Sequence, residues 1–131
     1  MTCTILDELP DPPKEEDNPN AIFKGGYLRK GGAMLLVSTT GTGKSVMTIQ
    51  ASMCWSVGVE AFGICPVRPQ TVAIIQAEDD ATEVADFRNQ ISRGLIESGT
   101  LTSDQLRNAR KSILVADFVG LVGGKFISEF R

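Results

Sequence analysis

The sequence predicts an α/β fold in which helices flank a parallel β-sheet. Short apolar runs of strand length alternate with segments whose apolar residues recur every three or four positions. Continuous apolar runs are typical of strands that are buried on both faces. A glycine-bearing loop also joins the first apolar run to the first helical segment. The length of 131 residues suits one such domain.

The first 20 residues differ in composition from the rest of the chain. They contain four prolines, and six acids stand against one lysine, which gives this segment a net charge of −5. This composition predicts a disordered arm, so the domain is expected over residues 21–131. Because the whole chain carries −3, the remainder carries +2. A nearly neutral body does not indicate nucleic-acid binding, although an assembled ring could gather modest charge into one channel.

The first predicted strand and helix surround the glycine-bearing loop. Residues 33–37 are a continuous apolar run and predict a buried strand. Residues 44–57 predict a helix that Gly58 would end. Before the strand, two glycine pairs mark turns on either side of Tyr27. We expect Phe23 and Tyr27 to anchor this lead-in to the core, with stacking of an aromatic ring on a nucleotide base as the alternative.

The later elements continue the alternation of strands and helices. Residues 71–76 predict a second strand and residues 82–98 a helix. A short helix that ends near Arg110 would be capped by Thr102 or Ser103. Residues 112–117 predict a third strand, and residues 125–131 predict the start of a further helix whose apolar side chains need cover.

The loop itself reads as a phosphate-binding loop of the pattern G-x-x-x-x-G-K-[ST]. Its first position holds Ser38 in place of glycine. Backbone N–H groups of such a loop and the positive end of the following helix attract phosphate oxygens. Lys44 would reach the β- and γ-phosphates, and the Ser45 hydroxyl would bind Mg²⁺. The expected nucleotide-binding residues are Thr39, Thr40, Gly41, Thr42, Gly43, Lys44, Ser45 and Val46.

Acidic residues follow the second predicted strand. In an open α/β sheet the active site lies at the carboxyl ends of the strands, so Glu78, Asp79 and Asp80 should face the same crevice as the loop. Glu78 is the candidate for accepting a proton from water beside the γ-phosphate. Asp79 could hold a metal ion or a metal-bound water, and Asp117 ends the third predicted strand in the form of a metal-supporting aspartate. Solvated charges at a helix start remain the alternative interpretation.

Other classes of chemistry are excluded or disfavoured by composition. The chain has no histidine, which removes Ser-His triads and histidine metal sites. The three cysteines show no metal-ligand spacing, and Cys54 is expected to be a buried apolar residue. No apolar run is long enough to span a membrane, and the N-terminus lacks the pattern of a signal peptide. We therefore expect a cytoplasmic protein without a membrane partner.

The loop at residues 38–45 and the strand that ends in Glu78 and Asp79 together resemble RecA-like P-loop NTPases. The sequence is most similar to the RepA-type branch of hexameric replicative helicases, in which an apolar strand ends in Glu-Asp and an arginine, here Arg88, follows in the next helix. The resemblance runs from about Ile22 to the end of the sequence.

This resemblance implies ATP and Mg²⁺ as cofactors, ring assembly, single-stranded DNA as a partner and a catalytic role for Glu78 together with Lys44. The family's Walker B aspartate lies on a later strand than the sequence reaches, so the chain resembles only the front half of such an ATPase. A fragment of a longer protein, a split gene product and a degraded relic all fit this pattern.

Two functional hypotheses follow. The first is an AAA/RepA-type ATPase that couples Mg-ATP hydrolysis to work on DNA in replication. The alternative is a nucleotide-binding module that does not hydrolyse ATP and acts by association. A small-molecule kinase is disfavoured, because the sequence shows no arginine-rich substrate lid.

Overall fold

The structure is a computed structural model and describes residues 4–76 and 81–117. Three short 3-10 turns occupy the N-terminal part: η1 (Leu6–Glu8), η2 (Glu15–Asp17) and η3 (Lys24–Gly26). The regular elements that follow are α1 (Lys44–Ser56), β1 (Val72–Gln76), α2 (Ala81–Glu97), α3 (Ser103–Ser112) and β2 (Ile113–Asp117). The predicted helices over residues 44–57 and 82–98 and the predicted strands over residues 71–76 and 112–117 are confirmed to within two residues at each end.

The two strands form a parallel pair. Val72 of β1 lies opposite Ile113 of β2, and the register runs to Gln76 opposite Asp117. A parallel pair needs a long crossover connection, and here α2 and α3 supply it. The described residues therefore form a small α/β unit with a two-stranded parallel sheet, in agreement with the predicted fold class at this level.

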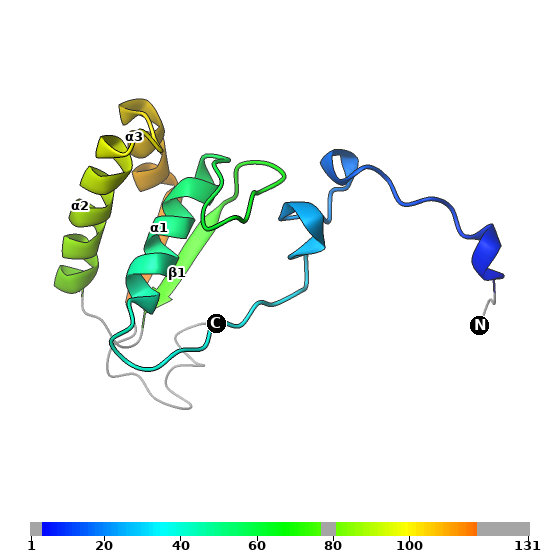
Figure 1. The fold of residues 1–131 in the computed structure, drawn as a ribbon, viewed down its shortest axis with the longest axis horizontal. Helices are drawn as coiled ribbons and strands as arrows, with labels where there is room; N and C mark the ends of the chain where they lie inside the picture. The colour runs from blue at the N-terminus through cyan, green and yellow to red at the C-terminus, as the bar shows by residue number, and fades with distance from the viewer. Residues whose placement is uncertain (1–3, 77–80, 118–131) are drawn as a thin grey trace.

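Helix α1 is the central packing element. It contacts α2, α3, β1 and β2, and in Figure 1 it lies beside α2 in front of the strands. The most deeply buried large side chains belong to it: Met53 is 2% exposed and Cys54 is 1% exposed. Burial raises the pKa of the Cys54 thiol, because the charged thiolate is poorly solvated there. The prediction of a buried, apolar Cys54 is confirmed.

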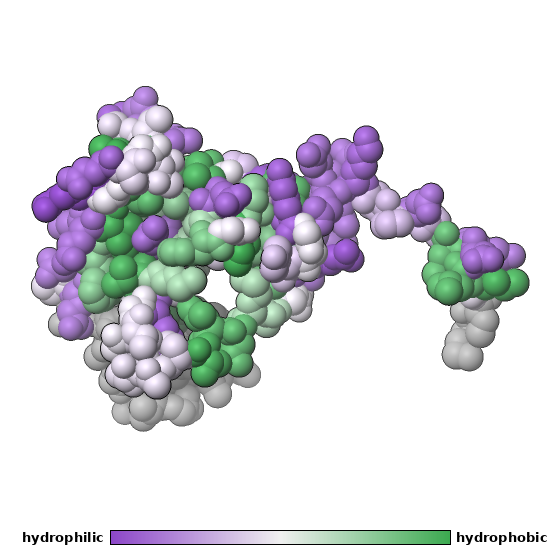
Figure 2. Space-filling view, in the orientation of Figure 1, coloured by the Kyte–Doolittle hydropathy of each residue, from purple (hydrophilic) through white to green (hydrophobic). Residues whose placement is uncertain are grey.

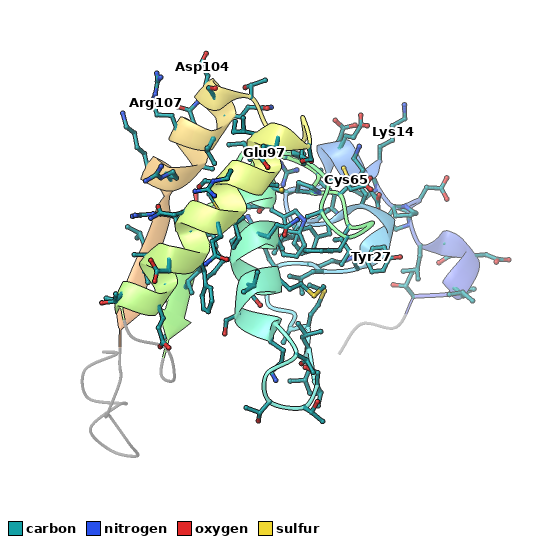
Figure 3. All side chains as sticks on the ribbon, turned by 60° about the vertical axis from the view of Figure 1, so that its left-hand side comes forward. Lys14, Tyr27, Cys65, Glu97, Asp104 and Arg107 are labelled. Carbon is teal, nitrogen blue, oxygen red and sulfur yellow. The ribbon has the colours of Figure 1, made fainter. Side chains whose placement is uncertain are left out.

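Helix α3 begins with a reciprocal hydrogen-bonded cap. The Thr102 hydroxyl accepts from the backbone N–H of Gln105, and the Gln105 side chain accepts from the backbone N–H of Thr102. This capping box satisfies two donors that helix geometry leaves without partners. Of the two predicted caps, Thr102 is the one that the structure uses. The outer end of α3 carries an exposed ion pair between Asp104 and Arg107 (Figure 3).

The prediction of a strand over residues 33–37 is wrong. These residues lie outside the sheet, and the side chain of Leu35 is 89% exposed. Apolar surface appears in Figure 2 where this segment approaches α1. A strand exists through backbone hydrogen bonds to a neighbour, and within the described chain β1 and β2 pair with each other and not with this segment. The apolar composition of residues 33–37 suggested a buried strand, but composition does not show whether a neighbouring strand is available for pairing.

The lead-in segment packs against the end of α1 and the loop before β1. The Phe23 and Trp55 rings lie 4.5 Å apart between centroids, and the Trp55 indole N–H donates to the Ile64 carbonyl. Phe23 is 4% exposed, so it anchors the lead-in as predicted. Tyr27 is 62% exposed, and its predicted anchoring role is wrong (Figure 3). Glycines at positive φ turn the chain just before Tyr27 and carry its ring outward.

The acidic segment extends away from the helices in Figure 1, but its final residues contact the lead-in. The Glu15 carboxylate accepts from the backbone N–H groups of Gly25 and Gly26 at 3.0 Å each. The Arg68 guanidinium donates to the backbone carbonyls of Asn18 and Ala21. Residues 15–21 are therefore tied to the body by hydrogen bonds. The boundary predicted at residue 20 stays a prediction.

Two further expectations concern membrane-spanning helices and the C-terminal residues. Among the described residues, no helix is long and apolar enough to cross a membrane. The helix predicted over residues 125–131 lies outside the described residues.

Replacing Met53 with alanine should lower the free energy of unfolding by about 2–5 kcal/mol, because it removes a fully buried side chain and leaves a cavity. Urea denaturation followed by circular dichroism measures the loss. The matched control is Met47→Ala on the same helix, where the side chain is 37% exposed and the expected change is about 0.5 kcal/mol. Equal losses at the two positions would contradict the assignment of Met53 to the core.

Candidate functional site

The loop that enters α1 is shaped by two glycines with positive φ. Gly41 has φ 79° and Gly43, the N-cap residue of α1, has φ 83°. A side chain is strained in this left-handed region, whereas glycine is not. A Cβ at either position would meet no atom within 4 Å, so backbone conformation and not space requires glycine. The sequence pattern placed these two glycines where the backbone needs them.

The N-terminus of α1 carries no side-chain cap, because its N-cap residue is a glycine. The first N–H groups of any helix have no partner within the helix. Together with the helix dipole, such groups make a site that attracts anions. Lys44 and Ser45 begin this helix and Val46 follows in its first turn, so three of the predicted binding residues lie at its positive end.

The Lys44 side chain folds back over the loop. Its Nζ atom donates to the backbone carbonyls of Ser38 and Thr39, each at 3.0 Å. An ammonium group has three N–H donors, so this arrangement leaves one donor for a further acceptor. The loop thereby holds a positive charge near the N-terminus of α1. A phosphate group bound there would be attracted by the ammonium and by the helix N-terminus.

Hydroxyl groups cross-link the same loop. The Thr42 hydroxyl donates to the Thr39 carbonyl at 2.8 Å, and it also contacts the Ser38 hydroxyl. In the sequence, Ser38 is a departure from glycine at the first position of the loop pattern. The structure gives it a hydrogen-bonded role that the motif did not indicate. The signal in the sequence is a pair of hydroxyl residues four positions apart.

The carboxyl ends of the strands lie at the same end of the molecule as this loop. Gln76 and Asp117 pair in register as the last residues of β1 and β2. Figures 1 and 3 both show the tip of the β1 arrow at the end of the fold where α1 begins. In open α/β sheets, ligand sites form at this edge. The element arrangement therefore brings the loop and the strand ends to a common edge.

Of the predicted acidic residues, only Asp117 lies within the described residues. Glu78, Asp79 and Asp80 lie outside the described residues, directly after β1 in sequence. Asp117 is placed by its backbone at the end of β2, beside the end of β1. Within residues 4–76 and 81–117, no three carboxylate or cysteine side chains gather as a metal site would require. The predicted roles of Glu78, Asp79 and Asp117 stay predictions.

A separate cavity lies between the helices and the sheet. Its volume is about 330 Å³, and its mostly apolar wall includes Met53, Ile74 and Val84. Two arginines, Arg88 and Arg110, also line it, and Arg110 was not singled out from the sequence. Arg88 donates to the Asn89 side chain. No residue of the loop lines this cavity. We place the candidate site at the loop, where the Lys44 ammonium and the uncapped N-terminus of α1 both attract anions.

Comparison with known families identifies the family of the chain. The family model described as AAA domain matches residues 7–118, which is most of the sequence. The chain belongs to the AAA domain family. Comparisons with curated proteins and with solved structures find no match. Membership implies nucleotide binding of the ATPase type, in agreement with the coarser part of the sequence prediction.

Gly43→Ala should lower the free energy of unfolding by about 1 kcal/mol and also weaken nucleotide binding, because alanine disfavours the positive φ that begins α1. Urea denaturation and titration calorimetry with ATP measure the two effects. Gly63→Ala is the matched control, since Gly63 has φ 76° and equally open surroundings in a turn away from the loop. It should lose similar stability and keep its nucleotide affinity. Equal weakening of binding in both variants would contradict a specific role for the loop.

Proposed function

We propose that the chain binds the phosphates of ATP on residues 39–46 and belongs to an ATPase that performs work on DNA. The observation that carries the proposal is the position of the Lys44 ammonium, fixed by two loop carbonyls beside the uncapped N-terminus of α1. This combination suits a polyphosphate better than a neutral ligand, because both groups attract negative charge. Family membership supports the choice of a nucleotide.

The loop contributes backbone N–H groups, one ammonium and one hydroxyl in this proposal. Backbone N–H groups from Thr39 to Val46 hold phosphate oxygens, and the glycines let the backbone approach them closely. Lys44 uses its remaining N–H donor on the β- and γ-phosphates. Ser45, at the start of α1, would hold Mg²⁺ through its hydroxyl, with Asp79 or Asp117 as further candidates for support. When bound, Mg²⁺ neutralises charge that develops on the phosphates.

Glu78 is the proposed general base for hydrolysis. It follows β1 by two residues in the sequence, and β1 ends at the same end of the molecule as the loop (Figure 1). A carboxylate at the carboxyl edge of a sheet can accept a proton from the water that attacks the γ-phosphate. The support for this step is the order of elements together with the resemblance described above, in which an acid of this kind ends the strand after the loop.

The finer assignment is a RepA-type replicative helicase that assembles as a ring on single-stranded DNA. Its support is the Glu78-Asp79 pair after an apolar strand, followed by Arg88 in α2. A DNA-dependent increase in ATP turnover, and assembly into a ring when ATP is added, are the properties that this assignment requires.

Lys44→Ala should weaken ATP binding at least about tenfold, because it removes a charge-assisted contact to the phosphates. Fluorescence titration with a labelled ATP analogue and Mg²⁺ measures the affinity. The control is Lys111→Ala in the last turn of α3, which removes an equal charge away from the loop and should bind as the wild type does. Equal affinities of Lys44→Ala and wild type would contradict the proposed site.

ATP turnover then separates the ATPase from a module that only binds nucleotide. In the ATPase, Glu78→Gln should retain ATP affinity and lose most of the steady-state turnover, because the amide cannot accept the proton. Binding that depends on Lys44, without turnover in the wild type, would instead support the module that acts by association. Addition of single-stranded DNA to the turnover assay tests the DNA-related part.

A further inference from the structure

The starting observation is a contact between two hydroxyl groups across the phosphate loop. Ser38 Oγ and Thr42 Oγ1 lie 2.5 Å apart, at the short limit for a hydrogen bond between two hydroxyls. Ser38 occupies the first position of the loop pattern, and Thr42 precedes Gly43. A glycine at the first position, as the pattern specifies, could not make this contact.

The distances favour one direction for the hydrogen bonds, although either hydroxyl could donate to the other. A hydroxyl has one hydrogen to donate. Thr42 lies closer to the Thr39 carbonyl, at 2.8 Å, than Ser38 does, so Thr42 is the better donor to that carbonyl and Ser38 the better donor to Thr42. In this assignment Ser38 does not use its longer, 3.4 Å hydrogen bond to the Thr39 carbonyl. The result is a one-way chain from Ser38 through Thr42 to the carbonyl of Thr39.

This chain ends on an atom that also holds Lys44. The Thr39 carbonyl oxygen accepts from the Lys44 ammonium at 3.0 Å as well as from Thr42. An oxygen with two lone pairs can accept both bonds. The two hydroxyls thus fix the direction of the carbonyl on which the lysine rests. The Ser38 carbonyl, from the same residue that begins the chain, is the second support of the ammonium.

We propose that Ser38 and Thr42 are positioning residues that orient Lys44 for phosphate binding. The inference rests on the proposed nucleotide site and adds residues that act through Lys44 and make no phosphate contact with their hydroxyls. In this chain serine replaces the expected glycine because its hydroxyl fastens the loop through Thr42. Without the hydrogen bonds of Ser38 and Thr42, the Thr39 carbonyl can turn. The Lys44 ammonium then has no fixed position before phosphate binds.

The order of the hydrogen bonds, from Ser38 through Thr42 to the Thr39 carbonyl, predicts the relative size of the mutational effects. Thr42→Val keeps the shape of the side chain but removes both hydrogen bonds, so ATP affinity should fall about three- to tenfold. Ser38→Ala removes only the first bond and should cost about two- to threefold. Because Ser38 acts through Thr42, the double variant should bind no more weakly than Thr42→Val alone. Thr42→Ser restores the hydroxyl and should bind within about twofold of the wild type.

Titration calorimetry with Mg-ATP on the full chain measures these four affinities, and thermal unfolding without nucleotide shows whether each variant folds. Ser38 and Thr42 are exposed, so unfolding temperatures close to the wild type are expected. Independent losses that multiply in the double variant, or a Thr42→Ser variant as weak as Thr42→Val, would overturn the inference. Unchanged ATP affinity in all variants would overturn it while leaving the proposed function intact. A wild type that does not bind ATP would overturn both.

Discussion

The packing of α1 against the two strands is the constraint on which the rest of the structure depends. Met53 and Cys54 bury their side chains under the helix, and this burial fixes the helix relative to β1 and β2. The N-terminus of α1 consequently lies toward the carboxyl edge of the sheet (Figure 1). A loop that enters this helix therefore lies at the same end of the fold as the tip of β1 (Figure 1).

The loop adds a second level of order to this frame. Gly41 and Gly43 permit its turns, and the carbonyls of Ser38 and Thr39 hold the Lys44 ammonium. Carbonyl groups on one side of the ammonium leave its remaining donor for an anion. The N-terminus of α1 is also positive, so it and the Lys44 ammonium both attract phosphate. The chemistry of the site is thus a product of local backbone geometry placed by core packing.

Local pattern was sufficient for most of the fold. Short sequence patterns were enough to predict these elements. They are the helical spacing of residues 44–57, the capping hydroxyl of Thr102 and the apolar runs that form β1 and β2. Pairing is a different matter, because it depends on residues far away in sequence. Residues 33–37 have the composition of a buried strand, yet their apolar side chains are exposed outside the sheet. Tyr27 shows the same limit, since an aromatic residue between glycine turns can face inward or outward.

The sequence motif predicted the glycines and the lysine of the candidate site, because it encodes the backbone shape directly. It did not predict the role of Ser38. The motif treats that position as a turn, whereas the hydroxyl chain to Thr42 and Thr39 emerges only when the loop is closed in three dimensions. The position of Arg110 in the cavity wall, which Arg88 also lines, depends on how α3 packs and could not be predicted from the sequence.

The central claim is that nucleotide binds at the loop that begins α1. Two-dimensional NMR of the ¹⁵N-labelled chain during titration with Mg-ATP tests it most directly. The account predicts the largest shifts at the backbone N–H groups of residues 39–46, with small changes around the cavity lined by Arg88 and Arg110. Shifts concentrated at that cavity, with the loop amides unchanged, would contradict it.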